Sequence, residues 1–213
     1  MRRLGVFAAC LGALTAGAAA RQGTGGGAGQ APQPQSLTAE VNGYYTTVAG
    51  FISRAAAQVP AEMYSFQPTP EVRSFARLFA HITDDNNGAC AALAGVTPPP
   101  ARVDAGSAGA WAADKMTKAD LEKGLNDSIA LCQKAFAALT PANVSEPAGG
   151  RGNRTRFGNL IYNTSHINEH YGNLVTYMRL KGMVPPSSAP RGGGPAPSDV
   201  ERPAPSGGEG AGD

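Results

Sequence analysis

Histidines are the residues of this sequence best suited to chemistry, and it contains three of them, His81, His166 and His170. His166 and His170 are four residues apart, so on a helix their rings project from the same side, one turn from each other. Two neutral imidazoles in this arrangement can bind one divalent ion at about 2.0–2.1 Å. His81, from a facing helix, would be the third ligand. Water would fill the open fourth position, which is typical of catalytic rather than structural metal sites.

A histidine that binds a metal also needs a hydrogen bond to its second ring nitrogen. The candidates close in sequence are Asp85, Asn86, Asn163 and Glu169. Glu169 is in addition the candidate general base, although its place one residue before His170 can instead direct it to solvent. The alternative interpretation is that the histidines bind nothing, because His-x-x-x-His pairs are common on solvated helix faces.

Four segments have apolar residues at the spacing of amphipathic helices, and these elements must position the histidines. The expected ranges are 36–59, 69–95, 117–141 and 160–182. The first histidine falls in the second segment, and the pair falls in the fourth. No stretch alternates long enough to predict a strand. We therefore expect an all-α fold, a four-helix bundle.

Capping signals predict where two of these helices begin. Thr69 is expected to cap the second helix, with Pro70 at the first helical position and Glu71 in the first turn. Thr117, with Asp120 three residues later, resembles a capping box and opens the third helix.

The connection between the second and third helices, residues 95–116, is long and rich in glycine, proline and alanine. An antiparallel neighbour needs less chain, so this length favours parallel helices two and three joined by a long crossover. Cys90 and Cys132 would then lie near the same end and could form a disulfide, which an antiparallel pair would prevent. Two buried, unbridged thiols are the alternative. Trp111 is expected to cover an end of the bundle, with ligand stacking as the alternative.

The ends of the chain predict export and disorder rather than further domains. Residues 1–20 have the charged start, short apolar run and small-residue cleavage site of a signal peptide, with a lipid anchor at Cys10 as the alternative. The apolar run is too short and glycine-rich for a stable membrane span. Residues 21–35 and 187–213 are an expected disordered linker and tail, which leaves 36–186 as the bundle. We expect an exported protein, periplasmic or extracellular, that is a monomer or a homodimer.

The charge balance argues against a nucleic-acid partner. The chain has 18 basic and 16 acidic residues, and removal of the signal peptide with its two arginines leaves equal numbers. Nucleic-acid binding needs a basic footprint, which this total does not supply. Arg151, Arg154 and Arg156, just before the fourth helix, can clamp an anionic group of a small molecule, or they belong to a solvated loop. On that helix we expect Tyr171 at the rim of the site and Tyr177 in the core.

Two segments resemble the DinB/YfiT-like family. They are VPAEMYSFQPTPEVRSFARLFAHITDDNNGAC, residues 59–90, and HINEHYGNLVTYMRLKGMVPP, residues 166–186. The resemblance covers nearly all of the expected bundle. It implies a four-helix bundle with a long crossover between helices two and three. It also implies a metal-binding triad, one histidine on the second helix and a His-x-x-x-His pair on the fourth, which His81, His166 and His170 match.

The resemblance also implies an activity. Relatives include thiol transferases that use bacillithiol or mycothiol and a mycothiol-dependent isomerase, in which a metal lowers the pKa of the thiol. Because we expect an exported protein, a hydrolase that uses a metal-activated water is an equal alternative to a thiol transferase. We expect a metal-dependent transferase or hydrolase acting on a small molecule, with a non-catalytic metal-binding or structural bundle as the alternative. A pocket at the open coordination position would favour the enzyme. The expected cofactor is a divalent ion, Zn, Ni or Fe.

Overall fold

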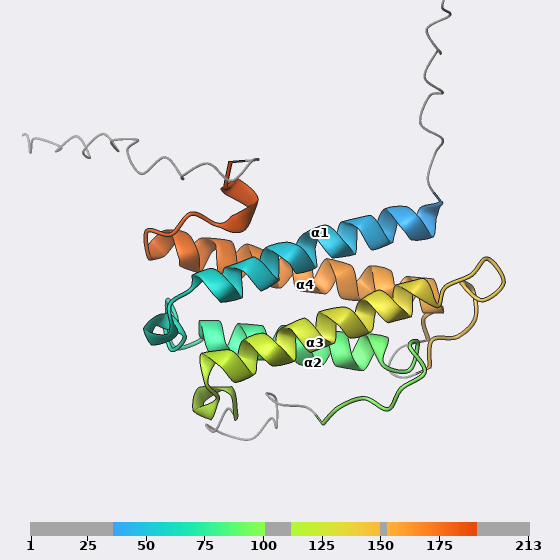
Figure 1. The fold of residues 1–213 in the computed structure, drawn as a ribbon, viewed down its shortest axis with the longest axis horizontal. Coiled ribbons are helices and arrows are strands. Elements are labelled where there is room, and N and C mark those ends of the chain that lie inside the picture. Colours follow the sequence, from blue (N-terminus) through green and yellow to red (C-terminus); the bar gives the residue numbers. More distant parts are fainter. Residues whose placement is uncertain (1–35, 101–111, 150–152, 191–213) are drawn as a thin grey trace, which may run out of the picture. The chain divides into compact units, whose positions relative to one another are not determined.

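The computed structural model describes residues 36–100, 112–149 and 153–190, and four long helices make up most of them (Figure 1). They are α1 (Leu37–Gln58), α2 (Phe75–Cys90), α3 (Lys118–Ala137) and α4 (Arg156–Leu180). Short 3-10 helices are η1 (Ala61–Met63), η2 (Ala112–Lys115) and η3 (Pro186–Ser188). The described residues contain no strand beyond one isolated bridge, Pro147 with Thr155, so the all-α prediction is confirmed.

Several expectations fall on other parts of the chain. The signal peptide (1–20), the linker (21–35), Trp111, Arg151 and the tail beyond residue 190 lie outside the described residues. The structure does, however, continue past residue 186, the expected end of the bundle, through η3. None of the helices in the described ranges is long and apolar enough to cross a membrane.

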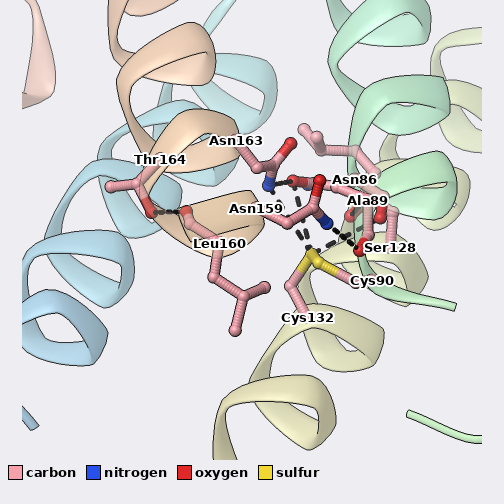
Figure 2. The surroundings of a disulfide bond; sticks show 10 residues. Asn86, Ala89, Cys90, Ser128, Cys132, Asn159, Leu160, Asn163 and Thr164 are labelled. Carbon is pink, nitrogen blue, oxygen red and sulfur yellow. Dashed lines mark hydrogen bonds between the residues drawn. A yellow bond between two sulfur atoms is a disulfide. The ribbon is translucent and has the colours of Figure 1, made fainter. Parts of the chain in front are cut away.

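The helices α2 and α3 run parallel, as predicted from the long connection between them. Asn86 of α2 pairs with Ser128 of α3, and one turn later Cys90 pairs with Cys132, so the numbers rise together along both helices. Cys90 and Cys132 form a disulfide with 4.9 Å between their Cα atoms, which confirms the predicted bridge (Figure 2). A parallel pair of neighbouring helices needs a crossover connection, as the sequence led us to expect.

The other two helices form a second parallel pair, and the two pairs are antiparallel to each other. Phe51 of α1 stacks on Tyr171 of α4, and further along Gln58 donates to the carbonyl of Val184, just after α4. In Figure 1, α1 and α4 lie on one side of the bundle and α2 and α3 on the other. Each helix thus buries its apolar face against two neighbours.

Serine and threonine caps begin all four helices. Ser36, Ser74, Thr117 and Thr155 each accept a hydrogen bond from a backbone amide in the first turn. The capping box predicted at Thr117 is confirmed, because the carboxylate of Asp120 also accepts a hydrogen bond from the backbone amide of Thr117.

The predicted start of α2 is wrong. Its cap is Ser74 rather than Thr69, and Pro70 lies in a turn where Val72 N donates to Thr69 O. The reason is tertiary: the amides of Phe75 and the next residue donate to carbonyls of the preceding connection, which holds the chain out of the helix until that point. The helix also ends at Cys90, five residues before the expected stop, and turns lead on to a glycine with φ of 73° at position 95.

An aromatic cluster fills one end of the core, next to the start of α2. Phe75 lies 6.2 Å from Phe79, and Phe79 lies 5.4 Å from Tyr64, measured between ring centroids. Tyr177 of α4 meets Phe75 edge-on at 5.5 Å, and Phe66 packs against both rings. Phe75 and Phe79 are fully buried. This cluster supports the part of α2 that carries His81, the first of the three predicted metal ligands.

Candidate metal centre

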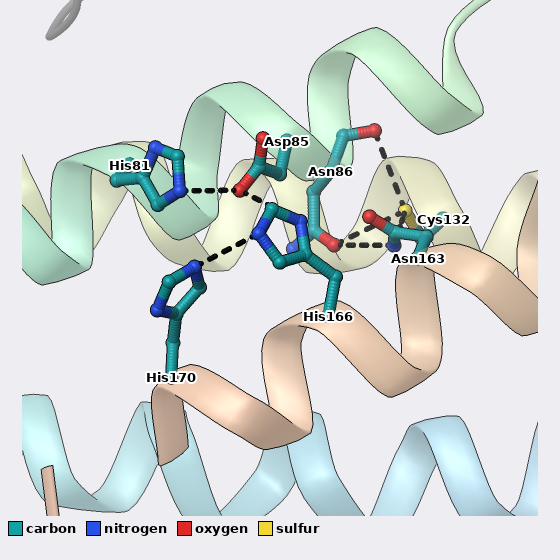
Figure 3. A network of polar contacts seen from close by, with 7 residues as sticks. All are labelled: His81, Asp85, Asn86, Cys132, Asn163, His166 and His170. Atoms are coloured by element: carbon teal, nitrogen blue, oxygen red, sulfur yellow. Dashed lines mark hydrogen bonds and ion pairs between the residues drawn. The ribbon is translucent and has the colours of Figure 1, made fainter. Parts of the chain in front are cut away.

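The antiparallel packing of α2 on α4 places His81 and Asp85 opposite His170 and His166 (Figure 3). His166 and His170 face each other with 3.0 Å between their Nε2 atoms. Asp85 Oδ2 lies 3.1 Å from His81 Nε2 and 3.3 Å from His166 Nδ1. One ligand atom from each of the four side chains lies within 4.8 Å of the others. The structure therefore brings the three predicted histidines together and adds a carboxylate.

This donor set fits a divalent transition-metal ion. Two nitrogens bound to one ion at about 2.0–2.1 Å lie roughly 3–4 Å apart, and the Nε2 atoms of His166 and His170 lie 3.0 Å apart. Burial, followed by the charges of His81, His166 and Arg73, lowers the pKa of His170 from 6.5 to about 3. The ring of His170 is thus neutral at pH 7, which is the form that binds a metal. A group of this kind can hold a metal ion.

Asp85 can serve the centre in two ways. Its carboxylate lies among the ligand atoms and can bind an ion directly. It also lies close enough to His166 Nδ1 to accept a hydrogen bond from an N–H there, and that tautomer leaves Nε2 with its lone pair facing His170. In either role the carboxylate would fix the ring of His166 and offset part of the charge of a bound ion.

The two buried asparagines expected near the site lie behind the centre. Asn163 Nδ2 donates to Asn86 Oδ1 over 2.9 Å, and Asn86 Nδ2 donates to Ser128 Oγ over 3.1 Å. Asn163 Nδ2 also lies 3.8 Å from the disulfide sulfur of Cys132 (Figure 2). These amides connect α2, α3 and α4 next to the disulfide. Glu169, in contrast, is exposed on α4 and is not among the four converging groups.

The two tyrosines of α4 both belong to the core. Tyr177 is buried in the aromatic cluster, as predicted. Tyr171, expected at the rim of the site, is instead buried against α1, where its ring stacks on Phe51 at 5.3 Å. Its hydroxyl accepts a hydrogen bond from the amide of Ser187 over 2.9 Å. Tyr171 therefore ties the segment after α4 to the bundle.

A pocket of about 520 Å³ opens beside the centre. Asp85 and His166 line it, and the side chain of each is 25 % exposed, compared with 13 % for His81. His170, at the other end of the centre, is buried. A small molecule can therefore approach the centre from the side of Asp85 and His166.

The arginines expected to clamp an anion have different positions. Arg154 lines the pocket, and its guanidinium lies 3.8 Å from the ring centroid of Tyr162, another lining residue. Arg156 points elsewhere and donates to the carbonyl of Leu93 over 3.2 Å, so it holds the start of α4 to the end of α2. Of the described arginines in this predicted clamp, Arg154 is thus the one beside the centre.

Sequence reasoning found the histidines but assigned Asp85 only the role of a hydrogen-bond partner. The signal for a ligand was its spacing, four residues after His81, which is the same spacing as that of the histidine pair on α4. Tyr162 and Asp84 also line the pocket, and helical spacing could have found them as well, because Tyr162 lies four residues before His166 and Asp84 three residues after His81. Arg154 carried no such signal, because it joins the site from the loop before α4, which packs near the end of α2, and local sequence does not encode that contact.

Replacing Asp85 by asparagine is expected to weaken metal binding about 10- to 100-fold, because either role requires a negatively charged oxygen at this point. The side chain keeps its size, so the bundle should stay folded. The neighbouring Asp84→Asn removes the same charge one residue away and is the matched control. A competition titration against a chromophoric chelator measures the affinity. Equal affinities for Asp85→Asn and the wild type would contradict this role.

Comparison with known proteins agrees with the fold and with the resemblance. The model of the DinB superfamily matches residues 51–174, a range that contains all three histidines. A solved structure described as that of a conserved protein of locus from Enterococcus faecalis is similar in fold, with a TM-score of 0.54 and 16 % identity. The similarity covers 69 % of this chain and 98 % of that chain. No curated protein matches the sequence.

Proposed function

This chain belongs to the DinB superfamily, and from its site we propose that it is a metal-dependent enzyme, a transferase or a hydrolase, that acts on a small molecule. The observation that carries the proposal is the convergence of four ligand groups at the wall of a pocket. A site that only sequestered an ion would not need an adjoining pocket of this size. The pocket therefore favours the enzyme over a non-catalytic metal-binding or structural bundle.

In this proposal His81, His166 and His170 hold the ion through their ring nitrogens, and Asp85 either binds it or orients His166. A divalent ion, Zn, Ni or Fe, would supply Lewis acidity and would lower the pKa of a bound water or thiol. The chain's own contribution is positioning. The buried ring of His170 stays neutral, and the pocket brings a small molecule to the exposed side of the centre.

We keep Glu169 as the hypothetical general base. Because its side chain is on the exposed face of α4, it can act only on a substrate that reaches that face. We also propose that the protein is exported. The disulfide supports this, because such bonds persist mainly in oxidising compartments.

Purified without chelator, the mature chain is expected to retain about one divalent ion, and the double variant His166→Ala/His170→Ala is expected to retain none, because one remaining histidine with a carboxylate binds far more weakly. Mass spectrometry for metals measures the content. Asn168→Ala, at an exposed position between the two histidines, is the matched control and should retain the ion.

Circular dichroism shows whether each variant is folded. A wild-type protein that stays metal-free after incubation with Zn, Ni and anaerobic Fe(II) would refute the proposed function. An ion that persists in the double variant would mean that it binds at another site.

A further inference from the structure

The pocket beside the centre is polar as well as accessible. Two acidic residues, Asp84 and Asp85, line it from α2, while Tyr162 and His166 line it from α4. The rings of Tyr162 and His166 lie 5.9 Å apart, so the aromatic wall continues directly from the metal ligand. Arg154 reaches the same pocket from the loop that precedes α4. It is the cationic side chain among the described residues that line the pocket.

The backbone around Arg154 is held in place by a short paired segment. Ala148 N donates to Arg154 O over 2.9 Å, and Arg156 N donates to Glu146 O over 2.8 Å. The side chain is positioned as well, because its guanidinium lies over the ring of Tyr162. A stacked guanidinium directs its N–H groups sideways, in its own plane, and this geometry suits a planar carboxylate.

Charge points to the same kind of ligand. With a divalent ion bound and the imidazoles neutral, the ion, the two aspartates and Arg154 together carry one net positive charge. A pocket with this balance attracts an anion with a single charge more than a neutral or cationic molecule. The ion and the guanidinium are the two positive groups, and they lie at different parts of the wall.

We propose that the pocket selects a small molecule with a carboxylate, which pairs with Arg154 while the opposite, reacting end of the molecule lies at the ion. This inference rests on the proposed function, because it needs an ion in the centre. It makes Arg154 the residue that determines specificity, and Tyr162 the residue that positions it.

Monohydroxamates of malonic, succinic and glutaric acid test the proposal, because the hydroxamate binds the ion and the far carboxylate can reach Arg154. Each is compared with its primary amide, which has the same length without the charge. Binding to the metal-loaded full-length protein is measured by isothermal titration calorimetry. For one of the three ligand lengths, the acid should bind about tenfold to a hundredfold more tightly than its amide, as expected for a charge-assisted pair.

Arg154→Gln should reduce this preference to less than about threefold, because only the neutral hydrogen bonds are left. The same variant should bind acetohydroxamate as the wild type does, since that probe lacks a carboxylate. Arg54→Gln is the matched control. Its guanidinium also lies over an aromatic ring, that of Phe51, but Arg54 is on the exposed face of α1 and does not line the pocket.

The possible outcomes separate the two proposals. A chain that holds no ion refutes the proposed function and this inference with it. A chain that holds an ion but binds no acetohydroxamate, or shows no preference for the acid, refutes the inference alone, and so does a preference that survives in Arg154→Gln. If Arg154→Gln disturbs acetohydroxamate binding, Arg154→Lys is measured next. A lysine variant that binds acetohydroxamate normally and still prefers the acid to the amide supports the inference. A lysine variant that binds acetohydroxamate normally but has no preference for the acid overturns it.

Discussion

Removal of the disulfide, by Cys90→Ala together with Cys132→Ala, is expected to lower the free energy of unfolding by about 4 kcal/mol. The bridge joins residues 42 positions apart, and it restricts the unfolded chain over that whole loop. The loss in conformational entropy on cross-linking grows with the logarithm of loop length, which gives the estimate. Both cysteines are fully buried, so loss of packing adds to the effect.

Urea denaturation of the oxidised protein, the reduced protein and the double variant measures this difference. The reduced wild type should unfold at nearly the same urea concentration as the double variant, and reductant should not change the variant further. A difference of less than about 1 kcal/mol between the oxidised protein and the variant would show that the bridge contributes little, against the estimate from loop entropy.

Phe79→Ala is expected to destabilise the protein by about 3–5 kcal/mol, the range for truncation of a buried aromatic side chain. Phe79 is fully buried and contacts the rings of Tyr64 and Phe75, so its removal leaves a cavity in the middle of the aromatic cluster. It also lies two residues before His81 on α2. A shift of the helix into the cavity would therefore move His81, a proposed metal ligand.

Phe79→Leu is the comparison that isolates the cavity, since leucine fills most of the volume and is expected to cost less than about 1.5 kcal/mol if neighbouring side chains repack. Chemical denaturation of both variants gives the free energies, and a chelator competition gives the metal affinity. Similar losses for the alanine and leucine variants would mean that the ring contacts, and not the cavity, determine the stability at this position.

Periodicity predicted the helices well, because each long helix must bury a stripe of apolar residues wherever it packs. Periodicity was less able to predict which of two adjacent apolar residues is buried. Tyr44 lies at helical spacing from Val41 and Val48, which favours a buried position, but it is 48 % exposed. Tyr45 is instead fully buried, beside Phe136 of α3. The two tyrosines lie about 100° apart around the helix axis, and packing against the neighbouring helix decides which ring enters the core.

The start of α2 shows a second limit. Thr69, Pro70 and Glu71 make a good local start signal, but Ser74 caps the helix because the preceding connection supplies carbonyls to the first amides of α2. A proline after threonine suits a turn as well as a first helical turn, so the local signal was ambiguous. Tertiary hydrogen bonds resolved it.

The centre and its pocket were predictable to different degrees. The three histidines are scarce, and two have helical spacing, so sequence alone brought them to attention. The parallel pairing of α2 and α3 followed from the length of their connection. The pocket did not follow, because Arg154 reaches it from a loop whose path depends on the pairing of Ala148 with Arg154. Such a path is set by the folded bundle as a whole.

The close spacing of the ligand groups makes the centre sensitive to the axial register of α4 against α2. The groups span 4.8 Å, whereas one helical turn advances about 5.4 Å. If α4 slid along α2 by one turn, the pairs on the two helices would no longer meet, so a bound ion fixes the axial position of α4 against α2. The disulfide fixes α3 against α2 in the same way. If an ion binds there, α1 alone among the four described helices could shift along its axis without breaking a disulfide or a coordinate bond.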